Sequence, residues 1–194
     1  MTGKMAVHLT MGVIAVASWA GAQSDFDEYV AEIRQSGMSE SAGGSVGMVA
    51  GILSGGTTFK ATRGPDGSVG HSFSSNMCFV PTADPKLREK QRALQAAMAA
   101  KRDSWATFLK AQADTDHSGF VSTKEGAALR RRVETALVAT QLGISSMEEL
   151  AKAVALDRSE LQTDVAGYRA MRAEAVKQGL EGMPELPSSL DRAP

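Results

Sequence analysis

Oxygen-bearing side chains recur at short intervals in the twelve residues from Asp114 to Glu125. Counted from Asp114, they stand at the first, third, fifth, ninth and twelfth positions, and Gly119 stands at the sixth. Calcium is a hard cation that takes about six to eight oxygen ligands from carboxylates, carbonyls and water. A short loop supplies them only if alternate side chains point inward and the backbone turns sharply midway, which Gly119 permits because it adopts positive φ without a Cβ clash. The spacing therefore predicts a calcium-binding loop.

This stretch resembles the loop of the EF-hand family of calcium-binding proteins, in which two helices flank the metal site. The resemblance implies six ligands, in chain order: Asp114, Asp116, Ser118, Phe120, Ser122 and Glu125. The first three would bind through their side chains, and Phe120 would bind through its backbone carbonyl. Ser122 would bind directly or through a water molecule, and Glu125 would close the site with both carboxylate oxygens.

The two helices that such a loop needs are predicted independently of it. Asp84 suits the N-cap of a helix and Pro85 suits its first position, so we expect a helix from here to Ala113. A second helix is expected from near Thr123 to Gly143. The first helix carries its large apolar residues at helical intervals: Leu87, Leu94, Met98, Trp105, Phe108 and Leu109.

Two further helices are marked by capping sequences. Ser145 to Glu148 predicts the start of one, and Asp157 to Glu160 predicts the start of another. Four helices over residues 84–180 can bury a small core. We therefore expect a mainly α fold with a helical EF-hand domain at 84–180 and a loose C-terminal tail at 181–194.

Residues 23–83 are predicted to form a short helix followed by a Gly/Ser-rich flexible region. Ser24 suits the helix start, and the helix should stop near Gly37. From residue 37 to 75 the chain is rich in Gly, Ser and Thr, which is typical of flexible linkers. The alternative is a β-hairpin that turns at residues 64–67.

Residues 1–22 have the pattern of a secretory signal peptide. Lys4 gives the basic start, an apolar run extends from Met11 to Ala20, and small residues precede a cleavage position after Ala22. A membrane span needs about 20 apolar residues, and this run is shorter, so we expect cleavage rather than an anchor. The protein is therefore predicted to be secreted or periplasmic.

Charge and composition argue against several classes of protein. The 194 residues include 21 Lys and Arg against 22 Asp and Glu, whereas nucleic-acid binders usually have a clear basic excess. The single cysteine, Cys78, cannot form a disulfide within the chain. After the signal peptide, histidine stands only at His71 and His117, and no catalytic constellation is recognisable. We therefore expect neither an enzyme nor a nucleic-acid partner.

The predicted function is that of an exported calcium-binding protein with a single EF-hand, in a structural or sensing role. One alternative is a helical protein-interaction module that uses the loop only as a connector. A helix-turn-helix DNA binder over residues 141–165 is a weaker alternative, because Glu160 and Asp164 stand where a basic recognition face is needed. A protein partner is left open.

The resemblance raises the question of what pairs with the loop. EF-hands usually occur in pairs, and Val121, at the eighth position, would pair with the neighbouring loop. Residues 62–73 align with the loop on a Gly and a Val but lack its acidic ligands, so no second hand is predicted. We expect the later helices of this chain to cover Val121 and the protein to be a monomer. A dimer paired through Val121 is the alternative.

Overall fold

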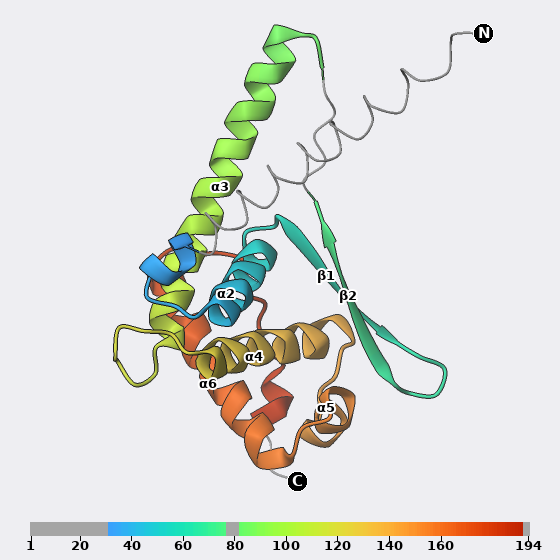
Figure 1. Ribbon diagram of the computed structural model, residues 1–194. Helices are drawn as coiled ribbons and strands as arrows, with labels where there is room; N and C mark the ends of the chain where they lie inside the picture. The colour runs from blue at the N-terminus through green and yellow to red at the C-terminus, as the bar shows by residue number, and fades with distance from the viewer. Residues whose placement is uncertain (1–30, 77–81, 192–194) are drawn as a thin grey trace, which may run out of the picture.

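The computed structural model describes residues 31–76 and 82–191, and its fold is mainly helical, as predicted. One long helix, α3, runs past a cluster of shorter helices, and a β-hairpin lies beside the cluster (Figure 1). The elements in chain order are α2 (Glu40–Leu53), β1 (Thr57–Arg63), β2 (Val69–Ser75), α3 (Pro85–Ala113), α4 (Thr123–Gln141), α5 (Met147–Val154), α6 (Arg158–Lys177) and the 3-10 helix η1 (Ser188–Asp191). The signal-peptide region, most of the predicted short helix and Cys78 lie outside the described residues.

Helix α3 begins and ends where the sequence predicts. The Asp84 carboxylate accepts a hydrogen bond from the Lys86 N–H, and Pro85 opens the helix. Its 29 residues correspond to a length of about 44 Å. Its buried side chains all lie in the C-terminal third, where Trp105 packs edge-to-face on Phe108 with ring centroids 5.7 Å apart. The rest of α3 extends past the core as an arm (Figure 1).

Helix α4 lies at the centre of the fold and packs against α2, α3, α5, α6 and β1. It buries Leu129 and Val133 in the shared core. Where α4 crosses α2, a Cβ added at Gly126 would lie 2.7 Å from the Cα of Ala42. The two backbones therefore touch at this point, and only glycine fits there.

The Gly/Ser-rich tract from residue 37 to 75 is not the flexible region that its composition predicts. Residues 31–35 are helical and the helix stops at Gly37, as expected, but α2 follows with Ser39 as its N-cap. Gly43 and Gly51 are among the buried residues of α2, where side chains from other elements lie close to their backbone. Small residues let α2 pack tightly against its neighbours, and this burial overrides the low helix propensity of glycine.

The alternative of a β-hairpin is correct for the second half of this tract. Strands β1 and β2 pair antiparallel, with Phe59 opposite Phe73. An isolated hairpin is marginal in water, but this one buries Phe59 and Ala61 in the core. The Gln141 side chain of α4 also accepts a hydrogen bond from the Ala61 N–H (2.8 Å) and donates one to the Phe59 carbonyl (2.9 Å). Residues 37–75 thus share one core with the helical domain.

Helices α5 and α6 follow the two predicted capping sites. Ser146 caps α5 by accepting a hydrogen bond from the Glu149 N–H, one residue later than predicted. Asp157 caps α6 by accepting one from the Glu160 N–H, as predicted. Within the described ranges, no helix is long and apolar enough to cross a membrane.

The segment after α6, predicted to be a loose tail, packs against that helix as far as residue 191. Met183, Leu186 and Leu190 are buried in the core. The Tyr168 hydroxyl of α6 donates a hydrogen bond to the Pro184 carbonyl at 2.8 Å. Burial raises the pKa of Tyr168, so its hydroxyl keeps this proton in alkaline solution. The segment after α6 is therefore part of the core and not a loose tail.

Replacing Leu190 tests this packing. Leu190 is 3% exposed, so we expect Leu190→Ala to lower the free energy of unfolding by about 2 kcal/mol or more. Leu94, at 58% exposure on the arm, is the matched control, and Leu94→Ala should change stability by less than about 0.5 kcal/mol. Urea denaturation measures both. Equal, negligible effects would mean that the tail is loose.

Candidate metal centre

The predicted loop joins α3 to α4 and is held at both ends by helix caps. Asp114 is the C-cap of α3, and its N–H donates a hydrogen bond to the Lys110 carbonyl. Ser122 is the N-cap of α4 and accepts a hydrogen bond from the Glu125 N–H. The helix-loop-helix arrangement that the resemblance implies is therefore present.

The Asp114 carboxylate folds the first half of the loop around itself. One oxygen accepts a hydrogen bond from the Ser118 N–H (3.0 Å), and the other accepts one from the Gly119 N–H (2.9 Å). Gly119 has φ +78° and no atom would contact a Cβ built on it, so its role is the sharp turn that the sequence predicts. The Asp114 carboxylate and the turn at Gly119 together set the shape of the first half of the loop.

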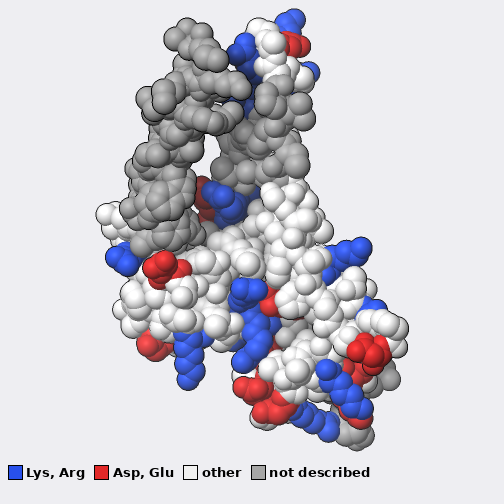
Figure 2. Space-filling model, turned by 45° about the vertical axis from the view of Figure 1, so that its right-hand side comes forward, with Lys and Arg blue, Asp and Glu red and all other residues white. Residues whose placement is uncertain are grey.

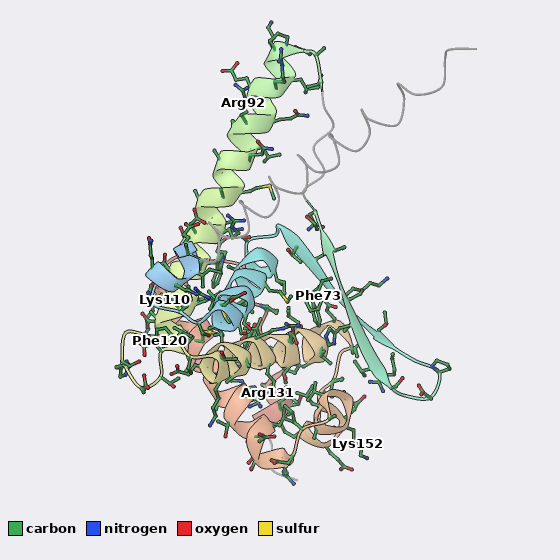
Figure 3. All side chains as sticks on the ribbon, in the orientation of Figure 1. Phe73, Arg92, Lys110, Phe120, Arg131 and Lys152 are labelled. Atoms are coloured by element: carbon green, nitrogen blue, oxygen red, sulfur yellow. The ribbon has the colours of Figure 1, made fainter. Side chains whose placement is uncertain are left out.

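Asp116 and Ser118 continue the same network. The Asp116 carboxylate accepts a hydrogen bond from the Ser118 N–H at 3.0 Å. Hydrogen bonds from Ser118 hold the pKa of Asp116 below its usual value, although the nearby charge of Glu125 opposes this. The Ser118 hydroxyl donates to the Phe120 carbonyl at 3.0 Å. The Phe120 side chain is exposed at the outside of the loop, so its carbonyl is the part that belongs to the site (Figure 3).

Glu125 closes the loop by bridging its two ends. One carboxylate oxygen accepts hydrogen bonds from the Thr115 N–H (3.0 Å) and hydroxyl (2.9 Å). The other accepts them from the Ser122 N–H (2.9 Å) and hydroxyl (2.8 Å), which completes a capping box at the start of α4. These hydrogen bonds, those from Ser122 first, lower the pKa of Glu125 to about 2. Glu125 is therefore an anion at neutral pH.

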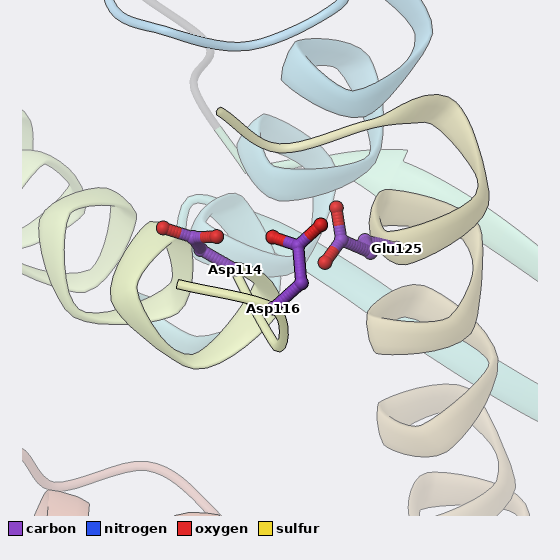
Figure 4. A group of neighbouring side chains, drawn as sticks. All are labelled: Asp114, Asp116 and Glu125. Carbon is purple, nitrogen blue, oxygen red and sulfur yellow. The ribbon is translucent and has the colours of Figure 1, made fainter. Parts of the chain in front are cut away.

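The three carboxylates converge on one side of the loop. Asp114, Asp116 and Glu125 each offer an oxygen atom, and these atoms lie within 4.8 Å of one another (Figure 4). Like charges this close repel unless a cation or a proton lies between them. Both oxygens of Glu125 are already held by N–H and O–H donors, so a bound cation would exchange some of these hydrogen bonds for metal contacts. The set of oxygen ligands suits a hard cation such as calcium.

Solvent reaches this side of the loop. A cavity of about 420 Å³ adjoins Asp116 and Glu125 and continues between Thr115 and Lys124. Asp116 is exposed, and Asp114 and Glu125 are half-buried. Asp116, Ser122 and Glu125 of the predicted ligand set therefore border this cavity.

The backbone of Val121 pairs with a segment of the same chain. Its N–H donates to the Gly37 carbonyl at 2.9 Å, and its carbonyl accepts from the Ser39 N–H at 3.0 Å, which forms a parallel bridge to Met38. The expectation that later helices cover Val121 is therefore wrong, since the segment before α2 does so. Val121 is fully buried.

Further contacts, which no sequence pattern predicted, tie this earlier segment to the loop. Lys110 donates a hydrogen bond from Nζ to the Ser36 carbonyl, and Figure 3 shows Lys110 close to the first described residues. The Ser39 and Thr123 hydroxyls are hydrogen-bonded at 3.0 Å. A Cβ at Gly37 would lie 2.8 Å from the Gly119 carbonyl oxygen. The sequence identified Gly37 only as the end of a helix, because backbone pairing has no side-chain signature.

In the helix-turn-helix alternative, Glu160 and Asp164 would lie on the recognition face, which needs to be basic. In the structure both acids lie beside an arginine of α4. Asp164 is 2% exposed, and the Arg131 Nε lies 2.7 Å from its carboxylate. Glu160 adds a second acid beside the same arginine. The arginine thus holds α4 and α6 together.

Comparisons with protein-family models, with curated proteins and with solved structures find no match for this chain.

A pair of glycine variants tests the contact between residue 37 and the loop. Gly37 and Gly55 both have positive φ (+75° and +84°), but no atom would contact a Cβ at Gly55. Gly55→Ala should cost about 1 kcal/mol from the backbone conformation alone. Gly37→Ala should cost about 1–2 kcal/mol more, because its Cβ meets the Gly119 carbonyl. Equal losses in denaturant unfolding would show that the segment is not held against the loop.

Proposed function

We propose that this is an exported calcium-binding protein in which the loop Asp114–Glu125, of EF-hand type, holds the ion. The observation that carries the proposal is the convergence of three carboxylates in a loop that a glycine turns and two capped helices hold. The convergence of the three carboxylates favours a hard cation over a simple connector, and the glycine turn and the helix caps hold the carboxylates in place. Export rests on the pattern of residues 1–22.

Each ligand has a distinct role in this proposal. Asp114, Asp116 and Ser118 bind through side-chain oxygens. Phe120 binds through its backbone carbonyl, which accepts a hydrogen bond from the Ser118 hydroxyl. Ser122 binds directly or through a water molecule. Glu125 turns both oxygens to the ion and gives up hydrogen bonds to Thr115 and Ser122. The ion would thereby neutralise the repulsion among the carboxylates.

The role that fits this geometry best is structural. Hydrogen bonds of the protein itself tie the loop to α3, to α4 and to the segment Gly37–Ser39. An ion that enters a preformed loop adds stability without a large gain in helix. Only three of the ligands carry charge, so the dissociation constant should lie at the weak extracellular end, about 10⁻⁴–10⁻³ M.

Two ligand variants test the site. Glu125→Gln removes a charged ligand but keeps a side chain that can cap α4, and Asp114→Ala removes the first ligand. We expect each to weaken calcium binding by at least about tenfold, about 1.4 kcal/mol, while the far-ultraviolet circular dichroism stays near that of the wild type. Calorimetric titration measures the affinity.

Asp103→Asn is the matched control, because Asp103 is an exposed acid on α3 outside the loop. It should leave the calcium affinity unchanged. If calcium bound the Glu125 and Asp114 variants as tightly as the wild type, the ion would be held elsewhere. If the wild type bound no calcium at millimolar concentrations, the proposed function would be wrong.

The backbone pairing of Val121 within the chain predicts the oligomeric state. Since Gly37 and Ser39 already satisfy its N–H and carbonyl, the loop needs no second molecule. We expect a monomer in sedimentation velocity both with saturating calcium and with chelator. A dimer that forms only with calcium would mean that the loop pairs between molecules.

A further inference from the structure

The part of α3 that projects from the core, the arm, comprises residues 85–104. None of its side chains before Trp105 is buried. Leu87 and Leu94, both large and apolar, are 45% and 58% exposed. Figure 3 shows Arg92 far from the packed helices, on the arm. Leu87 and Leu94 are seven residues apart, which is about two helical turns, so they lie on the same side of the arm.

The arm is also strongly basic in a chain that is nearly neutral overall. Between Pro85 and Ser104 it carries two acids, Glu89 and Asp103, and six cations: Lys86, Arg88, Lys90, Arg92, Lys101 and Arg102. Within the part of the chain that the structure describes, Lys86, Lys90, Arg92 and Lys101 form no ion pair. Blue side chains stand out at the tip of α3 at the top of Figure 2, beside a red one. These charges are available to a partner.

The apolar and charged residues are sorted by helix face. At about 100° per residue, Leu87, Leu94 and Met98 fall within about 40° of one another. Lys90 and Lys101 border this apolar stripe on one side, and Arg88 and Arg102 border it on the other. The two acids fall on the opposite face. This distribution is that of a helix that docks by its apolar stripe against an anionic partner.

At its base the stripe faces a groove. A cavity of about 240 Å³ lies between α3 and the end of α2 with the adjoining strands. Met98 and Arg102 line it from α3, and Gly47, Gly51 and Gly56 line the opposite side. Glycine lets another backbone approach closely. The groove thus continues the stripe toward the core.

The shape and the charge together select one kind of occupant. A flat membrane would meet α2 and the hairpin, which stand on the same side of α3 as the stripe at its base. A second copy of the arm would bring like charges together. A single helix whose apolar side is bordered by acidic residues can lie along the stripe without meeting α2 and the hairpin. Its charge is also opposite to that of the arm.

We propose that the stripe on α3 and the groove at its base dock an amphipathic helix of a protein partner, whose apolar side is bordered by Asp and Glu. The partner's apolar side chains cover Leu87 and Leu94, and its carboxylates pair with the lysines and arginines along both borders. This surface is separate from the loop, so the proposal stands whether or not the loop binds calcium.

The test uses the full chain and a fluorescein-labelled synthetic peptide of about 18 residues, or five helical turns, with a leucine stripe bordered by glutamates. Fluorescence anisotropy at low ionic strength should show saturable binding. The same peptide with lysine in place of glutamate should not bind. We expect Leu87→Ser with Leu94→Ser, and separately Lys90→Glu with Lys101→Glu, to weaken binding about tenfold.

Lys60→Glu with Arg158→Glu is the matched control, since it changes the net charge equally at exposed sites away from the arm. It should bind the peptide within about twofold of the wild type. If the control weakened peptide binding as much as Lys90→Glu with Lys101→Glu does, the effect would come from net charge alone. That result would overturn the proposal. No binding of the acidic peptide, or tighter binding to phosphatidylglycerol vesicles than to the peptide, would also overturn it.

Discussion

The backbone pairing between Val121 and the segment Gly37–Ser39 is the constraint on which the rest of the structure depends. Two hydrogen bonds of 2.9 and 3.0 Å join the middle of the loop to the residues that lead into α2. They place α2 against α4, where Gly126 allows the backbones to touch. They also fix the second half of the loop, so that Ser122 can cap α4 and Glu125 can reach back to Thr115. One contact thus sets both the packing of the helices and the geometry of the carboxylates.

The same backbone pairing explains how a single loop can have the backbone groups of Val121 hydrogen-bonded without a second loop. Unpaired backbone groups in a buried position are costly, and Val121 is fully buried. The earlier segment satisfies those groups from within the chain, where Lys110 also binds the Ser36 carbonyl. Backbone N–H groups of the loop also donate hydrogen bonds to the three carboxylates, which offsets part of the repulsion among them.

Sequence patterns predicted the features that depend on local chemistry. Asp84 with Pro85, and Asp157 with Glu160, mark helix starts because capping involves residues a few positions apart. The loop was predictable for the same reason. The helix α2 was not, because it is stabilised by packing against α3 and α4, which lie far away in the chain, and Gly126 lets the α4 backbone touch Ala42. The pairing of Val121 and the docking of Leu190 also depend on residues far away in the chain, and neither leaves a local pattern.

We propose that calcium binds in the loop Asp114–Glu125 and that its binding changes the environment of the paired segment Gly37–Ser39. Amide chemical shifts of the isotope-labelled protein during calcium titration test this most directly. We expect saturable shifts at Ser118 and Gly119, with accompanying shifts at Met38 and Ser39, while the shift of Leu190 stays unchanged. Calcium-dependent shifts that spare the loop, or no shifts at millimolar calcium, would contradict it.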